Sequence, residues 1–188
     1  MVVDRKTQIV EAAEKSFSMF GYKATTMDQI AKLANVGKGT IYTFFKNKEE
    51  LLRFIMTNLI KEMKVAAEET FDAKLSFHEN VHRAIYKMLE YRLQHKLAIK
   101  LFEEEKFGTP EVVDALKEFE NAIVGFIRKI LEEAIAKGHI VNCDTKITAF
   151  IIVKIYVALI FEWEKNNPSL TKEELANLLD LYIFKGLS

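Results

Sequence analysis

Residues 26–45 of the chain, TMDQIAKLANVGKGTIYTFF, carry two short helical patterns separated by a few residues. Apolar residues recur in the first half at the three- and four-residue spacing of one helix face, and a second pattern begins near Lys38. Asn35, between the two, tolerates the left-handed backbone conformation that ends a helix. The second helix is expected to turn Ile41 and Phe45 inward. The spacing therefore predicts a helix-turn-helix.

The outer side of the second predicted helix is polar. It carries one ammonium and three hydroxyl groups, on Lys38, Thr40, Tyr42 and Thr43. Such groups suit both the phosphate oxygens and the base edges of a DNA major groove. Gly39 has no side chain, so the backbone can lie close to DNA there. The periodicity alone is equally consistent with an ordinary helical hairpin whose polar face is only solvated.

The N-terminal part of the chain closely resembles the N-terminal signature of the TetR family of transcriptional regulators. The matching positions are Phe17-x-x-Phe20-Gly21-Tyr22-x-x-Thr25-Thr26-Met27-x-x-Ile30-Ala31-x-x-Ala34-x-Val36-x-x-Gly39-Thr40-Ile41-Tyr42-x-x-Phe45-x-x-Lys48-Glu49-Glu50-Leu51. The resemblance implies a helical repressor that binds a palindromic double-stranded DNA operator as a homodimer. It also implies dimerisation through the last two helices and release from DNA by a small ligand bound in the rest of the chain.

Carried over position by position, the resemblance also implies DNA contacts for individual residues. These are Thr26, Lys38, Gly39, Thr40, Tyr42, Thr43 and Lys48. Tyr42 and Lys48 match phosphate contacts. Lys38, Gly39 and Thr43 are better placed for bases.

Two positions depart from the family pattern. Asn35 stands where the family usually has Gly, a replacement that a helix end tolerates. Gly37 stands where Ser or Thr is usual. It lacks a capping hydroxyl, at a cost of about a few tenths of a kcal/mol, and loses a potential phosphate contact.

The composition predicts an all-α protein, and the apolar spacing and helix caps along the chain predict about nine helices. Of the 188 residues, 49% are hydrophobic and only two are proline, which suits a helical fold with a sizeable core. Period-two runs of β-branched residues are absent. We expect a helix-turn-helix head over residues 1–48 and a larger ligand-binding and dimerisation body over residues 49–188.

The formal net charge is zero, but the charges are unevenly distributed. Residues 1–48 hold eight Lys or Arg and four Asp or Glu, so the positive excess coincides with the predicted head. The single cysteine, Cys143, permits no internal disulfide and fits a reducing cytoplasm. No signal core or membrane-spanning segment is evident. We therefore expect a cytoplasmic protein without a membrane partner.

Two segments near the C-terminus predict a dimer interface. Residues 147–163 form the most apolar stretch, and a further amphipathic helix follows Thr171. A helix this apolar needs cover on several sides, which a symmetric four-helix interface would supply. The expected interface residues are Phe150, Ile151, Ile155, Ala158, Phe161, Leu175, Leu178, Leu179 and Tyr182. The alternative is that both helices pack only on their own core.

The body is rich in aromatic residues that could line an apolar ligand cavity. The candidates are Met88, Tyr91, His95, Phe102, Phe107, Phe126 and Trp163. Aromatic rings and a flexible methionine suit a lipophilic ligand. Taken singly, each of these residues is more typical of an ordinary core.

One motif predicts a different chemistry. Residues 78–82, His78-Glu79-Asn80-Val81-His82, match the HExxH pattern of zinc peptidases, in which two histidines bind zinc and the glutamate is a general base. A zinc peptidase is therefore the second alternative function. The pattern lies directly after Ser76, a predicted helix cap, which favours a solvated helix start instead. We therefore expect no catalytic residue, cofactor or metal. A helical interaction module without DNA binding is the third alternative.

Overall fold

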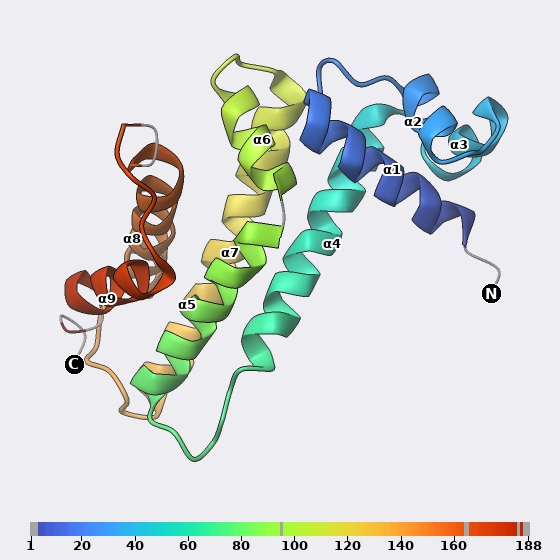
Figure 1. The fold of residues 1–188 in the computed structure, drawn as a ribbon. Coiled ribbons are helices and arrows are strands. Elements are labelled where there is room, and N and C mark those ends of the chain that lie inside the picture. Colours follow the sequence, from blue (N-terminus) through green and yellow to red (C-terminus); the bar gives the residue numbers. More distant parts are fainter. Residues whose placement is uncertain (1–3, 95, 164–165, 184, 186–188) are drawn as a thin grey trace. The chain divides into compact units, whose positions relative to one another are not determined.

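The computed structural model describes residues 4–94, 96–163, 166–183 and 185, with side-chain positions for all of these except residues 78, 89–94, 96 and 161. In this part of the chain nine α-helices and one π-helical turn follow one another, without a strand (Figure 1). They are α1 (Arg5–Phe20), α2 (Met27–Leu33), α3 (Lys38–Phe44), α4 (Lys48–Glu68), α5 (Phe77–Gln94), α6 (Lys96–Glu105), α7 (Pro110–Ala136), α8 (Thr145–Val157), the π-helical turn η1 (Ala158–Glu162) and α9 (Lys172–Tyr182). The predicted all-α fold is confirmed.

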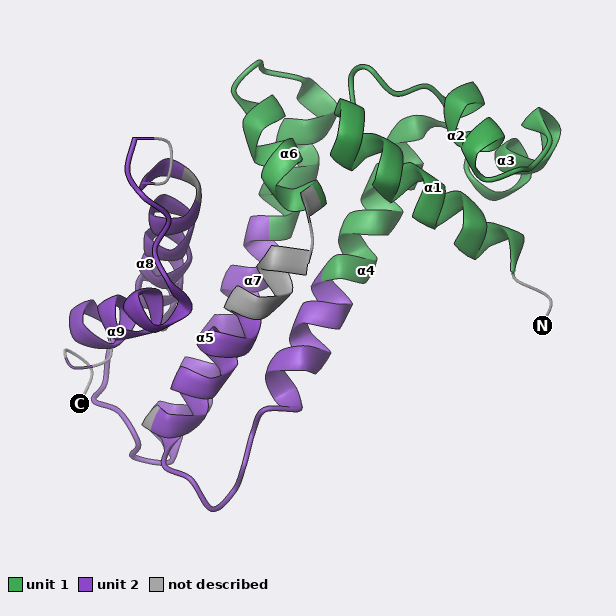
Figure 2. Cartoon of the chain, in the orientation of Figure 1, with its two compact units in different colours: residues 1–59, 95–119 green, residues 60–94, 120–188 purple. Residues whose placement is uncertain are grey.

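The helices group into two compact units, which Figure 2 distinguishes by colour. Unit 1 comprises Met1–Leu59 and His95–Phe119, and unit 2 comprises Ile60–Gln94 and Glu120–Ser188. This grouping differs from the predicted division at residue 48, because α6 packs against α1 although it lies far along the chain. The predicted division concerns which residues bind DNA and stays a prediction.

Asp4 and Gly21 set the two ends of α1. Asp4 caps the first turn by accepting a hydrogen bond from the backbone N–H of Lys6. Gly21 ends the helix with φ 85° and ψ 163°, a conformation essentially restricted to glycine. A glycine directly after an apolar helical pattern predicts a helix end, and this prediction is confirmed at Gly21.

One side of α1 is buried in unit 1. Ile9, Ala13 and Phe17 are buried, as their spacing predicts. Phe20 continues the same three- and four-residue spacing, which predicts that it lies on this side, but it is 62% exposed. The reason is that the Tyr22 ring, beyond the end of the helix, packs beside Phe17 with 5.5 Å between ring centroids.

The core of unit 1 holds the two shortest helices in place. Seven-residue helices such as α2 and α3 are not stable alone, because helix nucleation is costly. Each therefore depends on side chains buried against its neighbours. The large buried side chains of this core are Phe17, Ile30, Ile41, Phe45, Leu51, Leu52, Ile55 and Leu101.

Three predicted caps organise unit 2. Ser76 and Glu79 form reciprocal hydrogen bonds at the start of α5. Asp144 accepts two backbone hydrogen bonds at the start of α8. Thr171 and Glu174 form a capping box at the start of α9. All three helix starts are confirmed.

The apolar core of unit 2 lies between α5, α8, η1 and α9. Leu175 packs with Ile160 of η1, and Leu179 packs with Ile183. Ile85 of α5 borders both clusters. One side of α9 is therefore buried within the chain itself.

The eighth helix is shorter than predicted. The sequence predicts one helix almost to Pro168, but the regular α-helix ends at Val157 and a π-helical turn follows. The N–H of Trp163 bonds the carbonyl of Ala158, a step of five residues. Apolar residues on all sides of this segment leave no periodic signal that separates the two helix types. Neither α8 nor any other helix in the described ranges is long and apolar enough to cross a membrane.

The conformation of Gly21 predicts a site-specific loss of stability. A Cβ at this position would lie 2.9 Å from Glu104 Oε2. An alanine there would also have to keep the positive φ of Gly21. We expect Gly21→Ala to lower the free energy of unfolding by about 1–3 kcal/mol, measured by urea denaturation. Gly125→Ala is the matched control, since nothing lies within 4 Å of its Cβ position in α7. Gly125→Ala is expected to raise the free energy of unfolding by about 0.5–1 kcal/mol. Equal free energies of unfolding for the two variants would contradict the requirement for glycine at position 21.

Candidate nucleic-acid interface

The start of α2 is fixed by a capping box. The Thr26 hydroxyl accepts the N–H of Gln29, and the Gln29 side chain accepts the N–H of Thr26. The sequence predicts Thr25 or Thr26 as this cap, since both are residue types that favour the N-cap position, but we assigned no role to Gln29. The spacing of Thr26 and Gln29 is itself the signal for such a box. Thr26 thus lies at the exposed beginning of the helix-turn-helix.

The turn between α2 and α3 has the predicted form. Asn35 has φ 53°, in the left-handed region expected for it. The N–H of Val36 returns to the carbonyl of Ala31 and closes the end of α2. Gly37 is the N-cap of α3 and provides no side-chain hydrogen bond. The predicted loss of a capping hydroxyl is therefore confirmed.

The two sides of α3 differ as the pattern predicts. Ile41 and Phe45 are buried, whereas Tyr42 and Thr43 are exposed. The Thr43 hydroxyl donates a hydrogen bond to the carbonyl of Thr40 at 2.7 Å. Its oxygen keeps lone pairs that can accept a hydrogen bond from outside. The exposed side thus presents hydrogen-bonding groups on a rigid element.

Lys38 is exposed and forms an ion pair across the turn. Its Nζ lies 2.9 Å from Oδ2 of Asp28, at the start of α2. The hydrogen bond and the negative charge of Asp28 raise the pKa of Lys38. Both partners are solvated, so a phosphate can compete for the ammonium. From the sequence, Asp28 is expected only to interact favourably with the dipole of α2 from its first turn, since no local pattern links residues ten positions apart.

Lys48, which the resemblance implies as a phosphate contact, is bonded within unit 1 in the chain without DNA. Its Nζ donates to the carbonyls of Tyr22 at 2.7 Å and Thr25 at 2.8 Å. The ammonium also lies 4.2 Å from the centre of the Tyr22 ring. Burial lowers the pKa of Lys48, opposed by the negative charges of Glu104 and Glu111. In the free chain this ammonium is engaged internally, and its phosphate contact stays a prediction.

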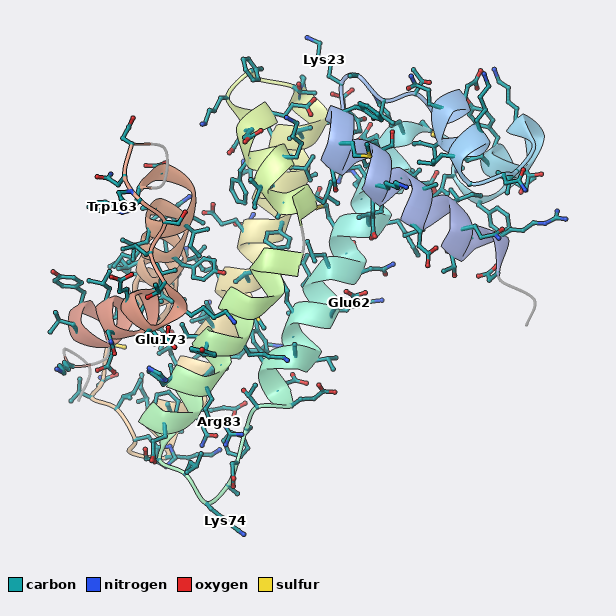
Figure 3. The ribbon with its side chains drawn as sticks, in the orientation of Figure 1. Lys23, Glu62, Lys74, Arg83, Trp163 and Glu173 are labelled. Carbon is teal, nitrogen blue, oxygen red and sulfur yellow. The ribbon has the colours of Figure 1, made fainter. Side chains whose placement is uncertain are left out.

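Glu104 was missed by the sequence analysis. Its side chain comes from α6 and is only 8% exposed. The carboxylate accepts the N–H of Tyr22 at 2.6 Å and the N–H of Lys23 at 2.7 Å. Figure 3 shows the Lys23 side chain pointing away from this loop, so only its backbone faces the carboxylate. No sequence pattern connects residues more than eighty positions apart.

Tyr22 lies among these charges. Burial raises the pKa of its hydroxyl, and the carboxylates of Glu111, Glu49 and Glu104 raise it further. The phenol therefore stays neutral. Its ring serves as a face for the Lys48 ammonium.

The predicted ligand residues are divided between the two units. Phe102 and Phe107 belong to unit 1, whereas Met88, Phe126 and Trp163 belong to unit 2. Phe107 is 82% exposed in the loop after α6, which is not the environment of a residue in a closed cavity. Trp163 is also exposed, as Figure 3 shows at the end of η1. The remaining candidates, Tyr91 and His95, lie outside the described side chains.

The predicted dimer residues separate into buried and exposed groups. Leu175 and Leu179 are each 2% exposed, because α9 packs this side on the core of unit 2. The structure therefore places both in the core of the chain and not on an outer surface, and Ile155 borders the same core. Leu178 is half-buried, and the side chain of Phe161 lies outside the described set. The members that are exposed are Phe150, Ile151, Ala158 and Tyr182.

The HExxH pattern lies in the first turns of α5, where its glutamate takes part in capping the helix. Oε2 of Glu79 accepts hydrogen bonds from the backbone N–H and the hydroxyl of Ser76. His82 is exposed, and the side chain of His78 is not among those described. Within the described residues, no group of three or more His, Cys, Asp or Glu is arranged to hold a metal ion. The glutamate of the pattern thus has a structural task at the helix start.

Comparison with known proteins covers both parts of the chain. A family model described as bacterial regulatory proteins, tetR family, matches residues 9–55. A model described as tetracyclin repressor-like, C-terminal domain, matches residues 74–187. The HTH-type transcriptional regulator YhgD of Bacillus subtilis (strain 168) is 56% identical to this chain over 189 residues, covering 100% of this chain and 99% of that protein.

Two further comparisons concern a fatty acid metabolism regulator and a regulator whose structure was solved with stearoyl-CoA. The fatty acid metabolism regulator protein of Bacillus subtilis (strain 168) is 27% identical, over 94% of this chain and 92% of that protein. The crystal structure of the transcriptional regulator FadR from Bacillus subtilis in complex with stearoyl-CoA has a TM-score of 0.76 at 26% identity. It covers 97% of this chain and 99% of that one.

These matches confirm the resemblance inferred from the first fifty residues and extend it over the body. With both family models matched and 56% identity along its whole length, the chain belongs to the TetR family of bacterial transcriptional regulators.

Proposed function

We propose that this chain is a repressor that binds a palindromic DNA operator as a homodimer and leaves it when a lipophilic effector binds the body. The observation that carries the proposal is the polar outer side of α3. Its exposed groups are held by the buried side chains of Ile41 and Phe45, so they form a rigid surface of hydrogen-bonding groups. A short helix with this polarity fits the major groove.

The contacts that we assign follow the resemblance to the family. We assign Lys38, Gly39 and Thr43 to bases and Tyr42 to a phosphate, and we count Thr26 and Thr40 among the residues that contact DNA. Lys38 exchanges its solvated partner Asp28 for DNA. Lys48 joins the phosphate contacts only if its ammonium leaves the two carbonyls that hold it in the free chain.

We assign the effector to the class of long-chain acyl compounds. Support comes from the similarity to a fatty acid metabolism regulator and to a regulator solved with stearoyl-CoA. Unit 2 also contains half-buried apolar side chains that suit an acyl chain, among them Met88 and Phe126. An acyl chain needs few polar partners, in keeping with these apolar side chains.

The homodimer is supported by the outer side of α8. Ile147, Phe150 and Ile151 are all exposed and share one helix face. Lys154, on the same face, is paired with Glu120 at 2.7 Å, so its charge is already neutralised. An apolar face of this kind marks an interface. A second copy also supplies the second head that a palindromic operator requires.

The operator can be sought directly. The purified chain is mixed with genomic DNA fragments of its own organism, and the bound fragments are sequenced. We expect enrichment of a palindromic site, with an affinity that falls steeply as salt rises because phosphate contacts release counterions. Failure to enrich any sequence would favour the interaction module without DNA binding.

The effector class is tested on the recovered fragment. Stearoyl-CoA is titrated into the protein–DNA complex, with coenzyme A as the control that lacks the acyl chain. We expect release by stearoyl-CoA alone. Binding of DNA that neither compound changes would overturn the effector class and leave the DNA-binding proposal intact.

Gly39 offers a variant that separates stability from DNA binding. Nothing lies within 4 Å of a Cβ built at this position, and alanine favours a helix. We expect Gly39→Ala to raise the free energy of unfolding by about 1 kcal/mol. If the backbone approaches DNA here, the added methyl group should weaken operator binding about ten-fold or more. Gly125→Ala is the control, with a comparable gain in stability and unchanged DNA binding expected. Unchanged operator affinity in Gly39→Ala would contradict the proposal that the backbone at this position lies close to DNA.

Ile151 tests the dimer. It is 45% exposed at the centre of the apolar face of α8. We expect Ile151→Glu to shift the chain to monomers, because a carboxylate would be buried unpaired in the interface. The measurement is sedimentation velocity, with folding checked by circular dichroism. Val141→Glu alters a similarly exposed residue in the loop before α8 and should leave the dimer intact. A dimer that persists in Ile151→Glu would place the interface elsewhere.

A further inference from the structure

The segment between α1 and α2, residues 21–25, is held by two side chains of opposite charge. We call it the α1–α2 turn. We propose that Glu104 is a positioning residue for DNA binding, which holds this turn and thereby the start of α2 in the orientation that the operator requires. The role rests on the proposed DNA binding, but its basis is the geometry of unit 1.

The Glu104 carboxylate uses both of its oxygens on neighbouring peptide groups. Oε2 accepts the N–H of Tyr22, and Oε1 accepts the N–H of Lys23. Charge-assisted bonds of this length are among the stronger ones in proteins. The approach depends on Gly21, since a Cβ there would meet Oε2 at 2.9 Å. A buried carboxylate and a glycine therefore form one fitted contact between α6 and the end of α1.

Lys48 holds the same turn through its carbonyl groups. Its ammonium bonds the carbonyls of Tyr22 and Thr25. The Tyr22 residue is thus fixed at its N–H by an anion and at its carbonyl by a cation. The hydroxyl of Thr25 further donates to the carbonyl of Gly21 at 2.8 Å. Side chains from α4 and α6 therefore supply bonds to the α1–α2 turn beyond those that the turn and the end of α1 make themselves.

The turn leads without a spacer into the helix-turn-helix. Thr25, whose carbonyl Lys48 holds, directly precedes Thr26, the N-cap of α2. A displacement of the turn therefore moves Thr26 and the two short helices that follow it. Recognition sites lose function when the residues that make the contacts are displaced by about 1 Å. Glu104 acts through these backbone groups and does not itself meet DNA.

The test compares two glutamates of α6. Glu104→Gln keeps the size of the side chain but leaves one acceptor oxygen for two N–H groups. Glu105→Gln makes the same charge change at the next, exposed residue. Operator affinity is measured by fluorescence anisotropy over a range of salt, and amide exchange of Tyr22 and Lys23 by NMR.

We expect Glu104→Gln to weaken operator binding about ten-fold, as for the loss of one charged hydrogen bond. The dependence of affinity on salt should stay unchanged, because no phosphate contact is removed. Exchange at Tyr22 and Lys23 should become faster than in the unmodified chain. Glu105→Gln should match the unmodified chain in all three readouts.

Three outcomes would overturn the role. One is wild-type operator affinity in Glu104→Gln with faster exchange at the turn, which would show that the turn does not orient the head. Another is equal weakening by Glu105→Gln, which would indicate a general charge effect. The third is an unmodified chain that binds no DNA, which would remove the proposed function and this role with it.

Glu104→Asp replaces Glu104→Gln in the test if the glutamine variant does not fold. Aspartate keeps the negative charge, but its shorter side chain cannot reach the N–H groups of both Tyr22 and Lys23. Operator binding should again fall, with faster exchange at Tyr22 or Lys23 in a chain that still melts cooperatively. Wild-type affinity with that faster exchange would overturn the proposal.

Discussion

The first unit of this chain depends on how the peptide groups of the α1–α2 turn are satisfied. A buried N–H or carbonyl without a partner costs about 1–3 kcal/mol, and this turn lies between two helices that cannot provide all its partners. A carboxylate from α6 and an ammonium from α4 supply them. Because the two groups carry opposite charge, each lowers the cost of burying the other.

The same constraint explains why α6 belongs with the N-terminal helices. Chain order would place residues 96–105 with the body, yet α6 packs against α1. Glu104 is the polar part of that contact. The head is therefore completed by a helix from the second half of the chain, and α2 and α3 rest on an assembly that includes it.

The apolar residues of α8 and α9 show a comparable division of tasks in unit 2. Leu175 and Leu179 close the core beneath α9, whereas Ile147 and Ile151 remain on the outside of α8. The buried group stabilises the unit, and the exposed group is left for a partner. A stretch that is apolar on all sides can serve both purposes only after packing has assigned each side.

The local elements of this protein follow from its sequence. Asp144, Thr171 and Asn35 mark helix ends through bonds to residues within a few positions, and the family signature lies in contiguous sequence. Such features are readable because backbone preference and capping act over one helical turn. The inward Ile41 and Phe45 of α3 follow from periodicity for the same reason.

The tertiary structure decided what those elements contact. It turned the Lys48 ammonium inward, exposed Phe20 and Phe107, and buried Leu179. It also brought Glu104 to the backbone of Tyr22. Periodicity states that a residue lies on an apolar or polar side, but not whether its neighbour is solvent, the chain's own core or a residue eighty positions away. The helix-turn-helix was therefore determined by sequence, and the groups that hold it in place were determined by packing.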